Sequence, residues 1–362
     1  GILFDFGTSE MFGNHKLTAY LQLVTNLKSS SFGANYTFLE KRQDLKINYD
    51  RYALQSINDE FVAQRYTKNE LELEVSHPFS VSSRITAAPF FTTTRYSDLR
   101  NVEQDDAIKN YMGFRTKYVL DNTKKAGLNM LVGSRGHAIF ENYQSLQGKN
   151  YNFSKLALDF RTYKRIHKQM TLALRGSYGM FMGNSKKSFM LGGMDNWIFS
   201  QTNENGNNNP LIMSQPVDNS NILFNEFATT MRGFDYNELY GEKYVLFNAE
   251  LRVPIVKMLQ NGPIASSFFR NLQLTGFYDV GSAWNGKTPF TENNSLNTNE
   301  IGGNGNVFSA TVVNYLNPFI YSYGLGARSL IYGYYVKLDV AWGVKNYVAR
   351  SPKVHFTLGY DF

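Results

Sequence analysis

The chain has 362 residues, carries a formal net charge of +7 and contains no cysteine. The absence of thiols excludes disulfide bonds, thiolate catalysis and cysteine-based metal sites. A positive charge can indicate a nucleic-acid partner, but the basic residues are spread along the whole chain and form no single stripe, so we expect no nucleic-acid binding. The sequence holds no run of about 18 apolar residues, the length that a membrane-spanning helix needs.

Alternation of apolar and polar residues is the main structural signal. The stretches "KLTAYLQLV", "NELELEV", "KLALDFRTY", "LFNAELRVPI" and "YVKLDVAWGV" each separate into one apolar and one polar face. A soluble β-sandwich would alternate in the same way. The predicted strands, however, run to about 10–14 residues, and Tyr, Phe and Trp gather near their ends, which is typical of membrane barrels. We therefore predict an all-β fold, a transmembrane antiparallel β-barrel.

The alternation divides the chain into sixteen candidate strands. Whether the number of strands is even or odd decides on which side of the membrane each chain end lies. Both chain ends of a bacterial barrel normally lie on the periplasmic side, so counting back from Phe362 makes residues 1–10 the second strand. Strand one would then lie upstream of Gly1, and one of the candidates in 31–77 would need dividing, around 54–66. A complete set of sixteen strands within the chain is the alternative. The candidates are residues 1–10, 16–26, 31–40, 43–54, 66–77, 83–96, 110–121, 126–140, 151–164, 168–182, 188–200, 243–256, 268–284, 319–331, 333–345 and 353–362.

The connections between candidate strands differ in length and composition. "MFGNHK" and "HPFSVSSR" predict short turns at the base of the barrel. Residues 201–242 and 285–318 form long insertions rich in Asn, Gly and Ser, which predicts extracellular loops. No linker divides the chain, so we expect one barrel domain over residues 1–362.

The order of several fragments resembles one superfamily. "FMLGGMDNWIF", "MRGF", "NAELRVPI", "FYDVGSAW", "YGLGARSLIYGYYVKLDVAWGV" and "HFTLGYDF" are similar to the C-terminal barrel of outer-membrane assembly and translocation proteins, the BamA, TamA and FhaC-like group with its bacterial surface antigen barrel. The resemblance covers residues 188–362 strongly and the earlier residues only in architecture. It implies a sixteen-stranded barrel in the bacterial outer membrane, with an N-terminal periplasmic module upstream of this sequence.

The resemblance also assigns a candidate site. In that family an Arg-Gly-Phe triplet tips the sixth extracellular loop and folds back into the lumen as a latch. About 38 residues separate Leu-Gly-Gly at 191–193 from the triplet here, where the family has only a few. An arginine in a partly dehydrated lumen needs carboxylate partners, and the alternation places Glu250 and Asp279 on the inward face. The implied latch is Arg232, Gly233 and Phe234, and its implied partners are Glu250, Phe277, Asp279 and Gly281, the last three in a Phe-x-Asp-x-Gly pattern. A solvated loop residue in an ordinary turn is the alternative for Arg232.

The last candidate strand carries one apolar and aromatic lane that ends with the chain. The lane resembles the signal by which outer-membrane barrels are recognised for insertion, and the strand would form one side of a lateral gate. Its members are Val354, Phe356, Leu358, Tyr360 and Phe362.

Catalysis is not expected. The five histidines show no metal-ligand spacing, and no G-x-S-x-G nucleophile elbow occurs. We therefore predict no enzyme activity, no metal and no cofactor. Inward charges could line a pore, although a polar lining is ordinary in a wide barrel. These charges are Glu70, Glu72, Glu74, Lys117, Arg175, Arg252 and Lys337.

The resemblance implies a function through the barrel wall. The barrel would open between its first and last strands, and the exposed edge would template client strands by backbone pairing. Its expected partners are outer-membrane lipid, client outer-membrane or secreted proteins, and a periplasmic module or lipoproteins. A scaffold or receptor for a periplasmic partner, or a passive or gated pore, are the alternatives.

Overall fold

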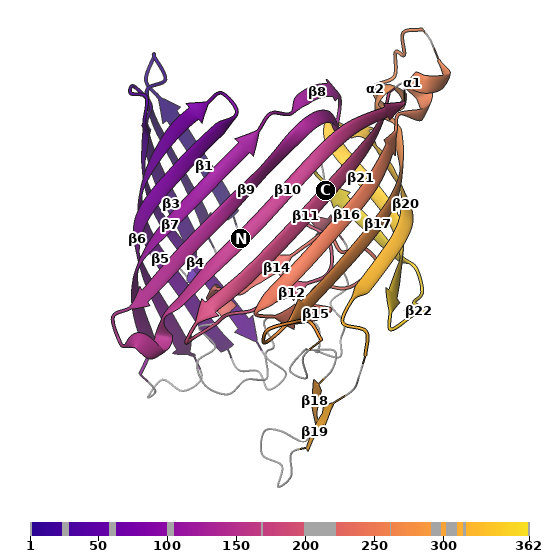
Figure 1. Cartoon of the computed structure of the whole chain (residues 1–362). Helices are drawn as coiled ribbons and strands as arrows, with labels where there is room; N and C mark the ends of the chain where they lie inside the picture. Colours follow the sequence, from indigo (N-terminus) through magenta and orange to yellow (C-terminus); the bar gives the residue numbers. More distant parts are fainter. Residues whose placement is uncertain are drawn as a thin grey trace.

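The computed structural model describes residues 2–23, 29–57, 63–99, 105–167, 169–198, 222–260, 262–290, 298–301, 310–313 and 316–360. One large sheet of tilted antiparallel strands curves into a wall, with short connections at one end and the insertion that holds β18 and β19 at the other (Figure 1). This architecture confirms the predicted all-β barrel fold. No helix among the described residues is long and apolar enough to cross a membrane.

Fifteen strands make up the wall in the described residues, and each pairs antiparallel with the next. In order they are β1 (Ile2–Ser9), β2 (His15–Leu23), β3 (Ser31–Phe38), β4 (Asp44–Ile57), β5 (Ala63–Ser80), β6 (Ser83–Asp98), β7 (Ala107–Asp121), β9 (Met130–Ser145), β10 (Phe153–His167), β11 (Met170–Gly183), β16 (Lys243–Val253), β17 (Gln273–Trp284), β20 (Ile320–Ile331), β21 (Tyr334–Lys345) and β23 (Lys353–Leu358).

Shorter elements decorate this wall. β8 extends the turn before β9, and β22 pairs with the end of β21. Three strands form a separate small sheet, in which β12 runs parallel to β14 and antiparallel to β15. The bounds are β8 (Lys124–Gly127), η2 (Lys149–Tyr151), β12 (Phe189–Leu191), β13 (Trp197–Ile198), β14 (Glu226–Ala228), β15 (Leu239–Gly241), α1 (Ile255–Leu259), α2 (Ser267–Asn271), β18 (Thr298–Ile301), β19 (Ala310–Val313) and β22 (Val348–Ala349).

The predicted strand at 188–200 is wrong as a wall strand. Its apolar residues imitate a membrane strand, but Gly192 and Gly193 adopt φ of 145° and 70° and interrupt the extended chain. The segment divides into β12, in the small sheet, and β13. β11 therefore pairs directly with β16. The expected division of a strand around 54–66 is also wrong, since β4 pairs directly with β5 up to Ile57 opposite Ala63, the described residues on either side of 58–62.

The predicted strand at 268–284 begins later than expected. Residues Ser267–Asn271 form the short helix α2, because the Ser266 hydroxyl accepts a hydrogen bond from the Phe269 backbone N–H and caps its first turn. β17 starts at Gln273. The last strand, expected over 353–362, ends at Leu358, and residues 361–362 lie outside the described part of the chain.

The two lanes of each strand face different environments. On β5, Leu71, Leu73 and Val75 are 44–49% exposed on the outer surface, whereas Glu72 on the opposite lane is 7% exposed. β21 follows the same rule, with an exposed Leu338 beside a buried lane of polar residues. Such apolar-out alternation is what a lipid-facing wall requires.

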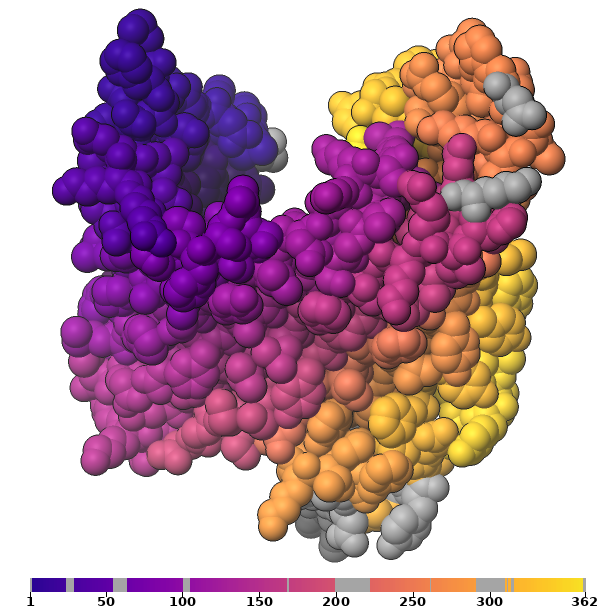
Figure 2. All heavy atoms as spheres, turned by 45° about the horizontal axis from the view of Figure 1, so that its top comes forward, coloured from indigo at the N-terminus to yellow at the C-terminus, as the bar shows by residue number. Residues whose placement is uncertain are grey.

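The ends of the wall remain apart in the described residues. The chain of antiparallel pairs holds an odd number of strands, so β1 and β23 run in the same direction. A direct pair between them would be parallel, and antiparallel closure takes a strand of opposite direction between them. Figure 2 shows a notch between the N-terminal strands in indigo and the C-terminal part in orange and yellow.

Candidate functional site

The Arg-Gly-Phe triplet lies at a tightly constrained bend. Thr230 adopts φ of 72° and Gly233 φ of 80°. For a β-branched residue such as Thr230 this conformation costs about 1–3 kcal/mol, so the surrounding contacts must hold it in place. At Gly233 an added Cβ would lie 2.7 Å from the backbone nitrogen of Gly343 on β21, so only glycine fits this close approach.

Arg232 lies inside the wall, 1% exposed, and contacts two strands. Its Nε and Nη2 donate to the two carboxylate oxygens of Asp279 on β17, each at 2.7 Å. Nη1 donates to Glu250 Oε2 on β16 at 2.9 Å. The guanidinium also lies 3.5 Å from the ring centroid of Phe277. The structure thus brings together four of the residues that the sequence singled out.

The paired carboxylates bind more than Arg232. Glu250 also accepts hydrogen bonds from Arg252 Nε at 2.6 Å and from Arg328 Nη2 at 2.6 Å. Arg328 reaches Asp339 on β21 at 3.5 Å, and Arg232 lies 3.9 Å from the same carboxylate. We call Arg232, Glu250, Arg252, Asp279, Arg328 and Asp339 the lumenal ion cluster.

Three guanidinium groups and three carboxylates therefore face each other in this cluster, with side chains 0–1% exposed. Burial alone would lower the pKa of Arg232, but Asp279 and then Glu250 outweigh it and raise the pKa above its usual value. Removing one member would leave an opposite charge buried without compensation, the costly case for an ion pair.

The sequence did not predict the whole cluster. Arg328, Asp339 and His355 received no role, and Arg252 appeared only among candidate pore charges. The alternation of apolar and polar residues already places these side chains on the inward face, so their orientation could be predicted from the sequence. Arg328 contacts Glu250 across 78 residues of sequence, and His355 contacts Gly233 across 122 residues; periodicity cannot reveal such contacts.

Segment 229–242 is also tied to the last strands. The Gly233 backbone N–H donates to His355 Nε2 on β23 at 2.8 Å. Lys353 Nζ lies 2.6 Å from Asp235, and Lys345 Nζ lies 2.7 Å from Glu238. The loop tip therefore bridges the lumenal ion cluster and the C-terminal edge of the sheet.

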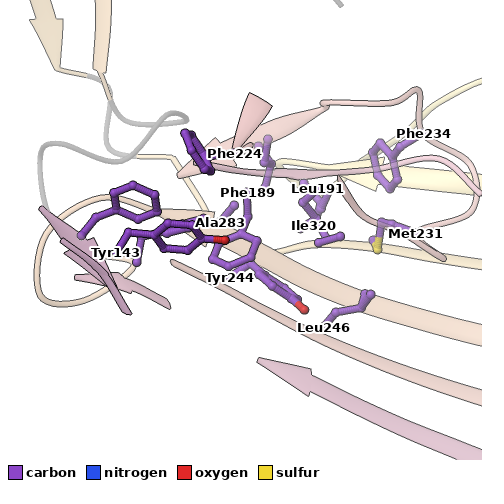
Figure 3. Close-up of a cluster of buried hydrophobic side chains, with 14 of the residues drawn as sticks. Tyr143, Phe189, Leu191, Phe224, Met231, Phe234, Tyr244, Leu246, Ala283 and Ile320 are labelled. Carbon is purple, nitrogen blue, oxygen red and sulfur yellow. The ribbon is translucent and has the colours of Figure 1, made fainter. Parts of the chain in front are cut away.

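A cluster of buried apolar side chains lies on the inner side of the wall (Figure 3). Phe234 and Met231, both fully buried, extend it from the loop tip. Gly281 of β17 leaves room for Leu191 of β12, since an added Cβ would lie 2.9 Å from the leucine side chain. The small sheet β12–β14–β15 thus packs against the inner wall. The buried members are Phe90, Tyr111, Tyr143, Phe153, Phe181, Phe189, Leu191, Phe224, Ala228, Met231, Phe234, Leu239, Tyr244, Leu246, Ala283 and Ile320.

The free edge of β23 carries an unexpected strand. β13 pairs antiparallel with it, Trp197 opposite Thr357 and Ile198 opposite Phe356. The Trp197 ring lies 4.2 Å from that of His355. β13 therefore occupies part of the edge at which the sheet ends.

The remaining last-strand residues are placed as follows. Phe356 and Leu358 lie half-buried on the outward lane of β23. Tyr360 follows the strand and stacks on Tyr335, with ring centroids 4.9 Å apart. Phe362 lies outside the described residues.

A second ion network spans the middle of the wall. Arg115 on β7 donates to Glu141 at 2.8 Å and to Glu70 at 3.1 Å, and it also pairs with Glu72. Lys155 on β10 pairs with Glu141 at 3.2 Å. The side chain of Arg115 is 23% exposed, so this network is wetter than the lumenal ion cluster. Two of the candidate pore charges, Glu70 and Glu72, are held in it.

Groups of three or more side chains suited to a metal ion do not occur among the described residues. The absence of catalytic groups and cofactors stays a prediction from the sequence.

A wall of apolar-out antiparallel strands with a polar lumen defines the class of outer-membrane β-barrel proteins. An Omp85 superfamily domain model matches residues 12–362. The chain therefore belongs to the Omp85 superfamily, as the resemblance of its fragments indicated, and its place is the bacterial outer membrane.

Solved structures agree at the level of the fold. BamA from Haemophilus ducreyi lacking POTRA domains 1–3 is 12% identical, with a TM-score of 0.60; the match covers 98% of this chain and 66% of that one. CdiB from Acinetobacter baumannii is 12% identical, with a TM-score of 0.52, and covers 98% of this chain and 55% of that one. The chain thus spans less than two thirds of both. No curated protein sequence matches the chain.

Proposed function

We propose that this barrel is the membrane module of an outer-membrane protein-assembly or translocation factor. It acts through a lateral gate between its first and last strands, and the Arg-Gly-Phe loop is a latch that braces the lumenal side of that gate. The clients are outer-membrane or secreted proteins, and a periplasmic module or lipoprotein partner delivers them.

The observation that carries the proposal is the pair of sheet ends at β1 and β23. An unpaired strand edge presents backbone donors and acceptors that template another strand. A client strand running opposite to both could pair with either edge by backbone hydrogen bonds, whatever its side chains. Such sequence tolerance is what a factor with many clients needs.

The contacts of the loop tip support its role as a latch. Gly233 donates to His355 of β23, while Arg232 is bound to β16 and β17. The loop thereby fixes the last strand relative to β17 and β16, which are three and four strands away in the wall. A template edge that stays in place loses less entropy when a client pairs with it.

β13 adds a condition to this mechanism. Because it covers Phe356 and Thr357 on the free edge of β23, a client that uses the full strand must first displace it. The pairing spans two residues, so a longer client strand competes well against it.

Site-specific photocrosslinking tests the proposal. A photoreactive residue at Val354, exposed on the outward lane of β23, should capture many different nascent barrel proteins in intact cells. The matched control is Phe91, exposed on the outward lane of β6 in the middle of the wall. Equal capture at both positions, or none at Val354, contradicts a gate at this edge.

The same experiment distinguishes a scaffold or receptor. A barrel that holds a single periplasmic partner would give one crosslinked product of fixed stoichiometry and no series of crosslinks to different client proteins. The pore alternative predicts size-dependent solute flux into liposomes. The apolar cluster that fills part of the lumen argues against free flux through that part.

A further inference from the structure

The outer surface of β4–β6 changes character along one line. On β5, the outward lane is apolar from Val75 through Leu71 and then becomes polar at Asn69 and Thr67 and basic at Arg65. Successive outward positions are two residues apart. A lipid-facing lane that ends in an arginine marks the level at which the wall leaves the hydrocarbon.

The neighbouring strands change along the same line. On β4 the lane passes from Tyr49 to Arg51, and on β6 from Phe91 to Thr93. The register places Arg51 opposite Asn69, and Asn69 opposite Thr93. Polar outward side chains therefore form a row across adjacent strands.

The height of this row fits a lipid headgroup. Asn69 and Phe79 are ten residues apart on β5, and a strand tilted by about 40° rises about 25 Å over that length. An apolar band of about 25 Å is what an outer-membrane barrel presents to lipid. Phe79 lies beside the short β5–β6 turn, so the row lies at the opposite, long-loop end, which is extracellular in such barrels.

A cavity of about 280 Å³ opens at this row on the outer wall. All of its lining side chains come from the outward lanes of β4, β5, β6 and β7. They are Arg51, Arg65, Thr67, Asn69, Thr93, Arg95 and Ile108.

The charges around the cavity favour an anion. Arg51 donates to Asn69 Oδ1 at 3.1 Å, and Arg95 Nε lies 3.3 Å from Asp106. The Arg95–Asp106 pair is 51% and 34% exposed, so its attraction is largely screened by water. The described residues bring no carboxylate into ion-pairing distance of Arg65. Three guanidinium groups thus converge on a small volume that also holds hydroxyl and amide donors.

We propose that this cavity binds the phosphate of an outer-leaflet lipid headgroup. Guanidinium groups present paired N–H donors that match phosphate oxygens, and Thr67 and Thr93 add hydroxyl donors. Ile108, 42% exposed beside the arginines, offers the apolar contact that an acyl chain needs. The anion comes from a lipid, not from solution, because the cavity faces the bilayer at headgroup height.

The opposite wall carries a different surface, which limits the site to β4–β7. There the outward lanes of β17, β20 and β21 carry the aromatic residues Tyr278, Tyr323 and Trp342. No arginine or lysine lies on those outward lanes. Aromatic girdles suit any interface lipid, whereas the arginine cavity selects for phosphate. The inference depends on the membrane placement of the barrel and not on the proposed gate.

Lipid retention by the purified barrel in detergent tests this site. Diphosphorylated lipid A is added, and its binding is measured by native mass spectrometry. The triple variant Arg51→Gln/Arg65→Gln/Arg95→Gln should lose at least about tenfold in apparent affinity. The matched control Lys41→Gln/Lys124→Gln/Lys125→Gln removes three exposed charges at the base end and should bind like the wild type.

Each further outcome decides a part of the inference. Equal binding by the arginine triple and the wild type, or an equal loss in the lysine control, overturns the site. Equal retention of dephosphorylated lipid A overturns the role of phosphate. Displacement by an equal concentration of inorganic pyrophosphate overturns the lipid source. Should the triple fail to fold, judged by its heat-modified gel mobility, Arg65→Gln alone should lose about threefold in affinity, and no loss would overturn the site.

Discussion

The C-terminal and N-terminal halves of the wall are filled very differently. Behind β16–β21 the inward lanes hold the lumenal ion cluster, and the apolar cluster runs along the inner wall from Phe90 on β6 to Ile320 on β20. Behind β1–β4, inward contacts are few and wetter, such as the 3.2 Å hydrogen bond from Tyr20 to Asp50, and every residue of β1 is exposed. The two edges of the sheet are therefore unequal, with β23 braced from within and β1 held by its pairing with β2.

This difference between the two edges predicts which strand moves when a gate between them opens. A strand whose inward side chains are buried and ion-paired opens only with much of its surroundings, whereas an exposed edge strand frays locally. We therefore expect β1 to move and β23 to stay as the fixed template.

Arg232→Ala should produce the largest loss of stability. It leaves Glu250 and Asp279 buried with less compensation, which costs about 3–5 kcal/mol. Urea unfolding in detergent, followed by heat-modified gel mobility, measures it. Asp279→Asn is the matched partner variant and should weaken the same contact. Two variants as stable as the wild type would show that the ion cluster does not brace the wall.

Arg115→Ala should have a smaller effect, about 1–3 kcal/mol, because its network with Glu70 and Glu141 is partly exposed and screened. The same unfolding assay, repeated at high salt, provides the check. Added salt should shrink the Arg115 effect more than the Arg232 effect. A larger loss at Arg115 than at Arg232 would reverse the comparison between the two halves.

Ile198→Pro should leave global stability nearly unchanged but free the edge of β23. Proline removes a backbone donor and disfavours strand pairing, so β13 should separate from Phe356 and Thr357. Photocrosslinking from Val354 to clients should then rise by about twofold or more over wild type, given that one or two hydrogen bonds are lost. Ile198→Val keeps the backbone and is the control; unchanged capture in the proline variant would mean that β13 does not compete for this edge.

Tyr20→Phe should have the smallest effect. It removes one partly exposed hydrogen bond to Asp50 in the sparsely filled half, at a cost of about 0.5 kcal/mol. Unfolding midpoints of the two proteins should nearly coincide. A loss comparable to that of Arg115→Ala would mean that the N-terminal half is braced as well.

Alternation predicted the wall well, because lipid on one side and a polar lumen on the other impose a period of two on every spanning strand. It failed at 188–200, where the equally apolar strand β12 is buried inside the lumen and β13 pairs with β23. There the two glycines with positive φ, Gly192 and Gly193, decide the path. Periodicity reports that a residue is buried on one face, and it does not report which apolar environment buries it.

The candidate site was predictable in part. The two-residue alternation along β16 and β17 is enough to predict that Glu250 and Asp279 face inward. The family resemblance singled out Arg232. The links to Arg328 and His355 come from strands distant in sequence that curvature brings to one lumen. The row of Arg51, Asn69 and Thr93 needed the strand register, which the sequence alone leaves open.

Hydrogen–deuterium exchange of the barrel in lipid nanodiscs tests the central claim most directly. Peptides covering 229–236 should exchange at least about tenfold more slowly than peptides covering β1, and Arg232→Ala should abolish that protection. Exchange of 229–236 in the wild type at the rate of an unprotected loop would contradict a loop tip held inside the lumen.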